Sequence, residues 1–323
     1  MGVILHETGV IIPCYNQGCY VARAIASVQQ QIYSAWELVV VDDGSTDDSA
    51  AIVKELAMND RRIRLIRQQN QGVSRARNRG AEVVSESVQY LLFLDADDML
   101  HPEMLQTLVA YLKQHARAGA VFCGFTRVDE NDRPIAAPQL FLVHARVPTM
   151  LGFRRLGLDY QGRIPFCTVM ADPVNLPSNT LIRRSVFERI GGWDETVPQP
   201  AEDRDLFMKI ALFSELHVVP KPLVYYRIHS QQSTKNLAFA LQQTAHLMRR
   251  WVQYWRQQPP SPERAEVLRS WHLSMGRVGA WNSLLAGWRM LRKGHLMTGV
   301  RNIIAGVRRY LTSFLPYEWG WMY

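Results

Sequence analysis

The chain has 323 residues, of which 47% are hydrophobic and 20% are charged, a composition typical of a globular protein with one large or two modest cores. Its four cysteines are scattered and form no CxxC pair, which argues against a disulfide framework or a zinc site and suits a reducing cytoplasm. The N-terminus lacks the pattern of a signal peptide, and no run of about 18 uncharged apolar residues predicts a membrane-spanning helix.

The net charge of +8 is unevenly distributed. From residue 240 onward there are 12 Lys and Arg residues and 3 Asp and Glu residues, a net +9, so the preceding residues carry −1. Seven of the nine tryptophans also lie in this last part. We therefore expect a near-neutral domain over residues 1–235 and a basic, Trp-rich helical region over residues 236–323.

Apolar runs alternate with segments of helical periodicity through the first 126 residues. We expect strands at 8–14, 37–42, 62–67, 89–94 and 119–126, and helices at 20–31, 47–58, 72–85 and between 98 and 115. The strands read as buried on both faces, which predicts a parallel α/β sheet. Because ligands bind beyond the carboxyl ends of such strands, we expect one rim to gather Tyr15-Asn16, Asp42-Asp43 and Asp95 to Asp98.

The second half of the chain has weaker periodicity. Residues 127–177 are rich in Pro, Gly and Arg and predict loops with short strands. We expect helices at 181–190 and 202–213, and a strand pair at 217–228 that is broken at Pro220 and Pro222. Beyond residue 236 we expect helices interrupted at 259–262.

Three carboxylates follow the fourth predicted strand. Asp95, Asp97 and Asp98 lie within four residues and repel one another, and a divalent cation would relieve that repulsion. Mg²⁺ and Mn²⁺ are typically held by one or two carboxylates together with phosphate oxygens of the substrate, which Asp95-Ala96-Asp97 suits. Alternatively, Asp98 caps the following helix, and Asp43-Gly44-Ser45 is only a turn and a cap.

Seven segments, in order across residues 8–233, resemble the family 2 glycosyltransferases of the GT-A fold. They are Val-Ile-Ile-Pro-Cys-Tyr-Asn (10–16), Val-Asp-Asp-Gly-Ser-Thr-Asp (41–47), Asn-Gln-Gly-Val-Ser-Arg-Ala-Arg-Asn-Arg-Gly (70–80), Phe-Leu-Asp-Ala-Asp-Asp (93–98), Gly-Gly-Trp-Asp-Glu (191–195), Glu-Asp-Arg-Asp-Leu (202–206) and Tyr-Arg-Ile-His (226–229). The resemblance implies a Rossmann-like, mostly parallel sheet flanked by helices, with a C-terminal helical extension. It assigns residues 1–126 to a nucleotide-sugar half and residues 127–235 to an acceptor half.

The resemblance also implies residues that contact the donor. Pro13, Tyr15 and Asn16 would border the nucleotide, and Asp42 or Asp43 would hydrogen-bond its base or ribose. The remaining donor-side residues would be Arg77, which reaches toward the donor with Asn78 nearby, and Asp95 with Ala96, where Asp95 contacts the ribose or a metal-bound water.

The metal and catalytic roles follow from the same resemblance. Asp97 would ligate Mn²⁺ or Mg²⁺ beside Asp95, and His229 would add a ligand. Asp203 would be the general base, with Glu202 as the fallback. The alternatives are that Glu202 and Asp203 only favour the dipole at a helix start, and that His229 is an ordinary residue at a strand end.

These residues predict transfer of a single sugar from a nucleotide-sugar, most simply a UDP-sugar, to an acceptor hydroxyl with inversion. The acceptor would be a glycan or lipid-linked precursor in cell-surface polysaccharide synthesis. The processive signature Gln-x-x-Arg-Trp is not matched, because Leu247 precedes Arg250-Trp251 where Gln is needed. A nucleotidyltransferase would need a glycine-rich phosphate loop, which Tyr15 to Gly18 does not supply, and a non-catalytic scaffold would not need the acidic set.

The basic tail has three interpretations. It covers the catalytic body, pairs with a second subunit, or rests on an anionic membrane surface at the inner face of the cytoplasmic membrane. Nucleic-acid binding is disfavoured because no known module accompanies the charge. An amphipathic pattern supports the membrane interpretation and combines basic with apolar residues: Lys293, Arg301, Arg308 and Arg309 with Leu291, Ile303, Ile304, Val307 and Leu311.

Overall fold

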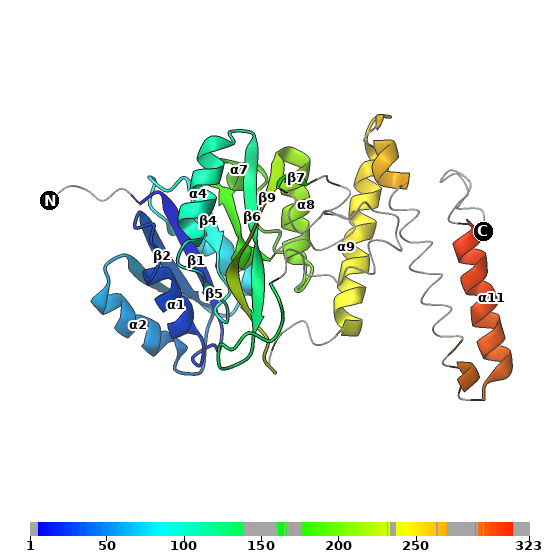
Figure 1. Ribbon diagram of the computed structural model, residues 1–323, viewed down its shortest axis with the longest axis horizontal. Coiled ribbons are helices and arrows are strands. Elements are labelled where there is room, and N and C mark those ends of the chain that lie inside the picture. The colour runs from blue at the N-terminus through cyan, green and yellow to red at the C-terminus, as the bar shows by residue number, and fades with distance from the viewer. Residues whose placement is uncertain are drawn as a thin grey trace. The chain divides into compact units, whose positions relative to one another are not determined.

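The computed structural model describes residues 6–138, 161–164, 166, 169, 176–230, 232, 237–262, 264–269, 288, 290–292 and 294–312 (Figure 1). These residues divide into two compact units, with the boundary after Leu247. The boundary lies inside helix α9 (Leu237–Gln257). The division into halves at residue 126 and the domain limit at residue 235 stay predictions. Most of the 127–177 segment lies outside the described residues.

The first four predicted strands form one parallel part of the sheet. They are β1 (Thr8–Cys14), β2 (Trp36–Asp42), β3 (Ile63–Arg67) and β4 (Tyr90–Phe93), in the order β3-β2-β1-β4. The pairs β1–β2, β2–β3 and β1–β4 are all parallel. The predicted positions of all four strands are confirmed. β1, β2 and β4 are buried along their whole lengths, whereas β3, at the end of the strand order, is buried only in part.

Three helices between these strands and one after β4 lie close to their predicted positions, although the last begins at Met104 and not directly after Asp98. They are α1 (Val21–Gln29), α2 (Ser49–Asn59), α3 (Val73–Val83) and α4 (Met104–Gln114). Val10 and Ile12 of β1 share a core with α1, α2 and α4. Ile11 points to the other face, where α3 approaches so closely that a Cβ on Gly80 would lie 2.3 Å from Ile11 Cγ2. The sheet therefore has helices on both faces.

One predicted helix is wrong in its first half. Residues 180–183 form strand β8 (Thr180–Arg183), and only α7 (Arg184–Arg189) is helical. The strand pairs antiparallel with both β4 and β6 (Ala118–Val128). Leu181 and Ile182 are both buried because neighbouring strands cover them on two sides. The apolar pattern alone fits either structure, so the pairing decides.

The predicted strand pair at 217–228 is instead one strand, β9 (Glu215–Arg227), which lies parallel to β6. Pro222 pairs with Gly124 at a register shift, so the strand absorbs both prolines without ending. Two short strands, β5 (Met99–Leu100) and β7 (Gly162–Ile164), pair antiparallel with β9. The sheet is therefore mixed, in the order β3-β2-β1-β4-β8-β6-β9-β5.

Two further helices agree with the sequence: α8 (Glu202–Phe213) and, in the tail, α11 (Leu296–Thr312). Within the described parts of the chain, no helix is long and apolar enough to cross a bilayer. The cysteines that the structure describes, Cys14, Cys19 and Cys123, are free thiols.

Candidate active site

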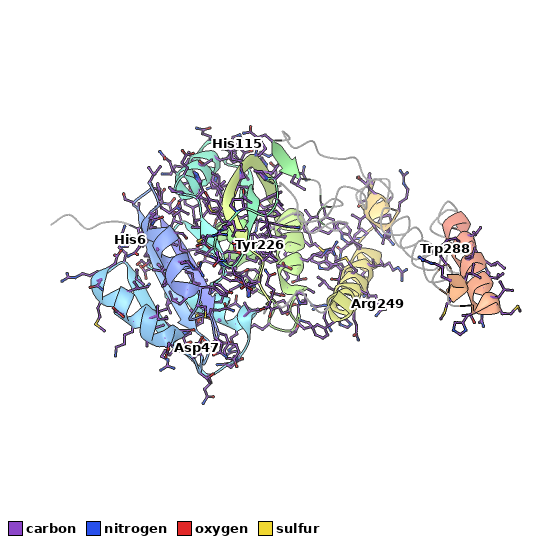
Figure 2. The ribbon with its side chains drawn as sticks, turned by 60° about the horizontal axis from the view of Figure 1, so that its bottom comes forward. His6, Asp47, His115, Tyr226, Arg249 and Trp288 are labelled. Atoms are coloured by element: carbon purple, nitrogen blue, oxygen red, sulfur yellow. The ribbon has the colours of Figure 1, made fainter. Side chains whose placement is uncertain are left out.

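The loops after β1 and β2 are bonded to each other at the rim of the sheet. Asn16 Oδ1 accepts a hydrogen bond from the backbone N–H of Thr46 (2.9 Å), and Asn16 N donates to Ser45 Oγ (2.9 Å). Asp47, labelled in Figure 2, accepts from the backbone N–H of Gly18 (2.9 Å). Asn16 adopts φ +53°, a left-handed conformation that asparagine tolerates. The first two polar clusters therefore meet, as predicted.

Of the residues expected to border the nucleotide, Tyr15 is 48% exposed and Pro13 is buried. The exposed ring of Tyr15 leaves one aromatic face open beside Asn16. The roles of Pro13, Tyr15 and Asn16 in donor binding stay predictions.

The carboxylates of Asp42 and Asp43 accept hydrogen bonds from other groups of the protein. Asp42 accepts from Ser45 N (3.1 Å) and from Arg67 Nε (2.9 Å). Asp43 accepts from the backbone N–H groups of Gln71 and Gly72, both at 2.9 Å, and so supports the start of α3. The alternative of a structural turn thus has direct support, while a contact with base or ribose stays a prediction.

Arg77 lies at the centre of the acidic rim. It is 2% exposed, and its guanidinium donates to Asp95 Oδ1 (2.7 Å) and to Glu202 Oε1 (3.2 Å). The guanidinium also lies 4.3 Å from the ring centroid of Trp193, a cation–π contact. Although burial alone would lower the pKa of Arg77, Asp95 and Glu202 raise it. The Arg77 guanidinium therefore joins the end of β4 to the start of α8.

The two candidate bases differ in their surroundings. Glu202 is 3% exposed, and burial raises its pKa although Arg77 lowers it. Asp203 is partly exposed, and its Oδ1 accepts from the backbone N–H of Arg204 (2.6 Å). Burial and then the charge of Glu202 raise the pKa of Asp203 to about 7. Both residues also lie in the first turn of α8, where a negative charge interacts favourably with the helix dipole. This stabilising role is compatible with a catalytic one.

Asp97 and His229 come together from distant segments. His229 Nε2 lies 2.8 Å from Asp97 Oδ2, and the Asp97 side chain is partly exposed. Among the described residues, no three His, Cys, Asp or Glu side chains are grouped as a complete metal site. A carboxylate and an imidazole nitrogen at this distance fit two protein ligands of Mn²⁺ or Mg²⁺, with the other positions left to phosphate oxygens and water.

Asp98 is a structural residue but not the helix cap considered above. It is 1% exposed, accepts from Ser178 Oγ (2.6 Å) and accepts from the backbone N–H of Arg227 (3.1 Å). Ser178 Oγ in turn accepts from the backbone N–H of Asp95 (3.1 Å). Burial and the nearby charges of Asp97 and Asp95 raise the pKa of Asp98. Helix α4 begins later, at Met104, beyond its reach.

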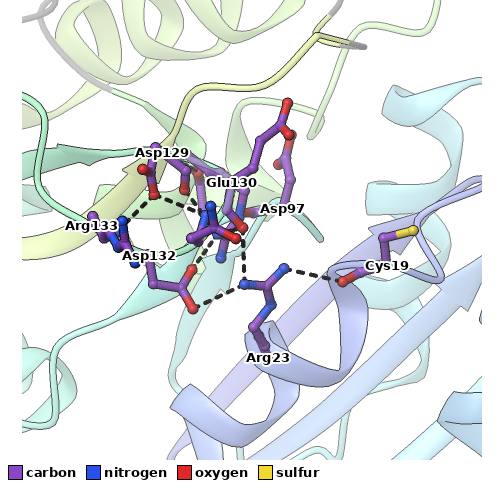
Figure 3. A network of polar contacts seen from close by, with 10 residues as sticks. Cys19, Arg23, Asp97, Asp129, Glu130, Asp132 and Arg133 are labelled. Carbon is purple, nitrogen blue, oxygen red and sulfur yellow. Dashed lines mark hydrogen bonds and ion pairs between the residues drawn. The ribbon is translucent and has the colours of Figure 1, made fainter.

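Arg227 connects the aspartate turn (residues 95–98) to a second acidic loop (residues 129–132). Figure 3 shows Asp97 of the turn close to Asp129, Glu130 and Asp132 of the loop. Arg227 is fully buried, and its Nε donates to the carbonyl of Asp97 (2.8 Å). Its Nη1 donates to the carbonyl of Asp129 (3.2 Å) and to the carboxylate of Asp132. Arg23 of α1 donates to the same Asp132 carboxylate (3.0 Å). Arg227 therefore joins the backbone of Asp97 to the loop that contains Asp129 and Asp132, and Arg23 joins the same loop to α1.

Asn78 secures the Gly-Gly-Trp turn. Its side chain accepts from the backbone N–H of Trp193 (3.0 Å) and donates to the Trp193 carbonyl (2.9 Å). Gly191 and Gly192 both have positive φ, and their N–H groups donate to carbonyls of the last turn of α7, so they cap the C-terminus of this helix. The buried Trp193 ring then supports Arg77.

Sequence reasoning missed Ser178 and left Arg227 without a role. Arg227 is part of the Tyr-Arg-Ile-His segment, and an arginine beside the candidate metal-binding histidine was the available signal. Ser178 had no signal, because its partners Asp95 and Asp98 lie 83 and 80 positions away.

A protein-family model described as "Glycosyl transferase family 2" matches residues 9–191, more than half of the chain. The uncharacterized glycosyltransferase YibD of Escherichia coli (strain K12) is 42% identical over 104 residues, 32% of this chain and 30% of that protein. An uncharacterized glycosyltransferase of Rickettsia bellii (strain RML369-C) is 28% identical over 234 residues, 71% of this chain and 31% of that protein. The chain thus spans about a third of the length of these curated relatives.

Solved structures resemble the chain over most of its length. S. aureus TarS 1-349 in complex with UDP-GlcNAc has a TM-score of 0.65 and 18% identity, covering 94% of this chain and 91% of that one. GalNAc-T7 with UDP, GalNAc and Mn²⁺ has a TM-score of 0.55 and 17% identity, covering 71% and 45%. These likenesses confirm the predicted fold class. The family model, which matches more than half of the chain, establishes that the chain belongs to glycosyl transferase family 2.

Proposed function

We propose that this protein transfers a single sugar from a nucleotide-sugar, a UDP-sugar in the first instance, to an acceptor hydroxyl with inversion at the anomeric carbon. The observation that carries the proposal is the position of Arg77, which holds Asp95 and Glu202 together from separate segments. A donor-side carboxylate and the candidate bases are thereby placed on one rim. The TarS complex with UDP-GlcNAc supports the choice of donor class.

The proposed chemistry divides between the two acidic segments. Asp203 is the more exposed of the two candidate bases and accepts the proton of the acceptor hydroxyl as the new glycosidic bond forms. Attack from the face opposite the leaving nucleoside diphosphate inverts the anomeric carbon. Glu202, with one oxygen on Arg77, is a positioning residue in this scheme and keeps a negative charge beside Asp203.

Asp97 and His229 are the proposed ligands of Mn²⁺ or Mg²⁺, with Asp95 next to them. The bound cation would stabilise the negative charge that develops on the departing diphosphate. The side chains fit this role because they converge at 2.8 Å and leave room in the ligand set for phosphate oxygens. The GalNAc-T7 structure with UDP and Mn²⁺ supports a metal in a related fold.

The proposed acceptor is a glycan or lipid-linked precursor of cell-surface polysaccharide. The basic tail supports this class, because a positive surface suits an acceptor presented among anionic headgroups. The unmatched processive signature supports the transfer of one sugar at a time.

Two variants test the proposal after a panel of nucleotide-sugars with Mn²⁺ has selected the donor. Asp203→Asn should bind donor as the parent does but lose roughly 10²- to 10⁴-fold in kcat, because a general base contributes about that factor. Asp97→Ala should remain folded and lose metal-dependent turnover. Steady-state transfer rates and donor binding by titration calorimetry measure both effects.

Asp48→Asn is the matched control, because Asp48 is exposed at the start of α2 and its side chain makes no capping bond. It should behave as the parent. Undiminished transfer by Asp203→Asn would show that another residue, with Glu202 first to test, is the base.

A further inference from the structure

Helix α11 presents an apolar face to solvent. Leu296, Met297, Val300, Ile304 and Val307 follow one another at spacings of one, three and four residues, which places them on one side of a helix. All five are exposed; Met297 is 84% exposed and Ile304 62% exposed. In the part of the chain that the structure describes, most of this face is therefore uncovered.

The border of this face is positively charged. Arg301 and Arg308 are exposed and follow Met297 and Ile304 by four residues, so each lies one turn along the same edge. No acidic residue occurs between Glu266 and Glu318, an interval that contains eight Lys and Arg residues. The charge around the apolar face is therefore of one sign.

We infer that α11 lies flat on an anionic lipid surface, with its apolar face among the acyl chains and its arginines against the headgroup phosphates. A helix with a wide apolar face, a basic border and modest overall hydrophobicity has the properties of an interfacial helix. Trp288, labelled in Figure 2, is exposed just before the helix, and indole rings favour the membrane interface. This inference is independent of the transferase activity proposed above.

Other occupants of the face fit less well. A spanning orientation is disfavoured because α11 has 17 residues with Arg301 within it, and no described helix is apolar enough to cross a bilayer. A second copy of the same helix would bring like charges together along both borders, whereas anionic headgroups have the complementary charge. The lipid surface is therefore the partner that both the apolar and the charged parts of the face favour.

Flotation of the full-length protein with lipid vesicles tests the inference. The chain should float with vesicles that contain phosphatidylglycerol and much less with pure phosphatidylcholine. The Arg301→Ser/Arg308→Ser double variant should bind roughly 25-fold more weakly, because each basic residue near an anionic surface contributes a factor of about five. Ile304→Asp should abolish flotation by placing a charge in the apolar face.

Thr298→Asp is the matched control, because it introduces the same charge at an exposed position on the opposite side of α11. It should float as the parent does, and circular dichroism should show equal helix content in all variants. Equal flotation of parent, Ile304→Asp and the double variant would overturn the inference. Size-exclusion chromatography with light scattering gives a second decisive outcome: a parent dimer that Ile304→Asp dissociates, without vesicle binding, would assign the face to a second copy.

Discussion

At the residue scale, Arg77 shows how far a motif can be interpreted from sequence. Three arginines occur at alternate positions of α3, and the resemblance singled out Arg77 as the one that reaches toward the donor. Arg75 and Arg79 form exposed ion pairs with Glu195 and Glu82. Arg77 is buried between the carboxylates of Asp95 and Glu202, and Glu202 lies on a helix 125 residues later in the chain. Its contact with the donor stays a prediction.

The raised pKa of Asp203 predicts how activity depends on pH. A general base works in its deprotonated form, so kcat/KM should rise with pH through about 7, the pKa to which burial and Glu202 raise this carboxyl. Glu202→Gln removes a negative charge beside Asp203 and keeps an oxygen that accepts from Arg77. The pKa should therefore fall, and the rising limb of the pH profile should move to lower pH.

Profiles of kcat/KM for parent and variant measure this shift. Glu188→Gln is the control, since Glu188 is exposed on α7 and pairs only with Arg184 in the described contacts, so its profile should match the parent. A rising limb that stays in place in Glu202→Gln would contradict the assignment of Asp203 as the titrating base.

At the element scale, local patterns identified β1, β2 and β4 because each is a short apolar run between helices. They failed for β8, where Leu181 and Ile182 continue into Val186 and Phe187 with spacing that fits a helix equally well. Only the pairing of β8 with β4 and β6 distinguishes the two structures. The prolines of β9 likewise suggested that the strand is interrupted. The structure accommodates Pro222 by a register shift against β6, and this shift cannot be predicted from the sequence of β9 alone.

The same limit applies to the candidate site. The rim itself was predictable, because each polar cluster follows a buried strand and parallel strands end at one edge. The contacts of Ser178 and Arg227 with the aspartate turn were not predictable, because they join segments that are far apart in the chain.

The junction of β9 with the aspartate turn should be a major source of stability. Arg227→Met removes the buried donor of the Asp97 and Asp129 carbonyls, while Asp132 keeps its bond from Arg23, so the free energy of unfolding should fall by about 1–3 kcal/mol. Arg23→Met removes the other arginine from Asp132 but at a partly exposed position, so its cost should be at most about 1 kcal/mol. Urea unfolding of both variants measures the difference. Equal losses of unfolding free energy would show that the buried bonds of Arg227 contribute no more to stability than the exposed ion pair of Arg23.

At the scale of the whole molecule, composition separated a neutral body from a basic tail, but the contact boundary lies at residue 247, inside a continuous helix. Composition could not locate that boundary, because a helix continues through it without a Pro or Gly between Leu237 and Gln257. Tertiary contacts, which composition does not report, set where one compact unit ends.

Donor and metal together should stabilise the protein against heat. With UDP and MnCl₂ at about 100 times the dissociation constant, binding adds about 2.7 kcal/mol. For a domain of this size that corresponds to a rise in Tm of roughly 5–10 °C. Asp97→Ala should keep the ligand-free Tm but lose most of the rise. Differential scanning fluorimetry with and without EDTA measures the effect, and a rise that ignores both EDTA and the variant would exclude these metal ligands.

The bond between Asp98 and the backbone of Arg227 spans 129 positions, and it bears on how the protein is made. A ribosome adds residues at about 5–20 per second, so the aspartate turn waits on the order of ten seconds before its partner strand is synthesised. During that interval Asp97 lacks His229 and Asp98 lacks Arg227, whereas Asp95 can already pair with Arg77. A nascent chain released before residue 227 would therefore have most of the parallel sheet but no assembled rim, and early truncation should give a binding-incompetent product even where the N-terminal strands have folded.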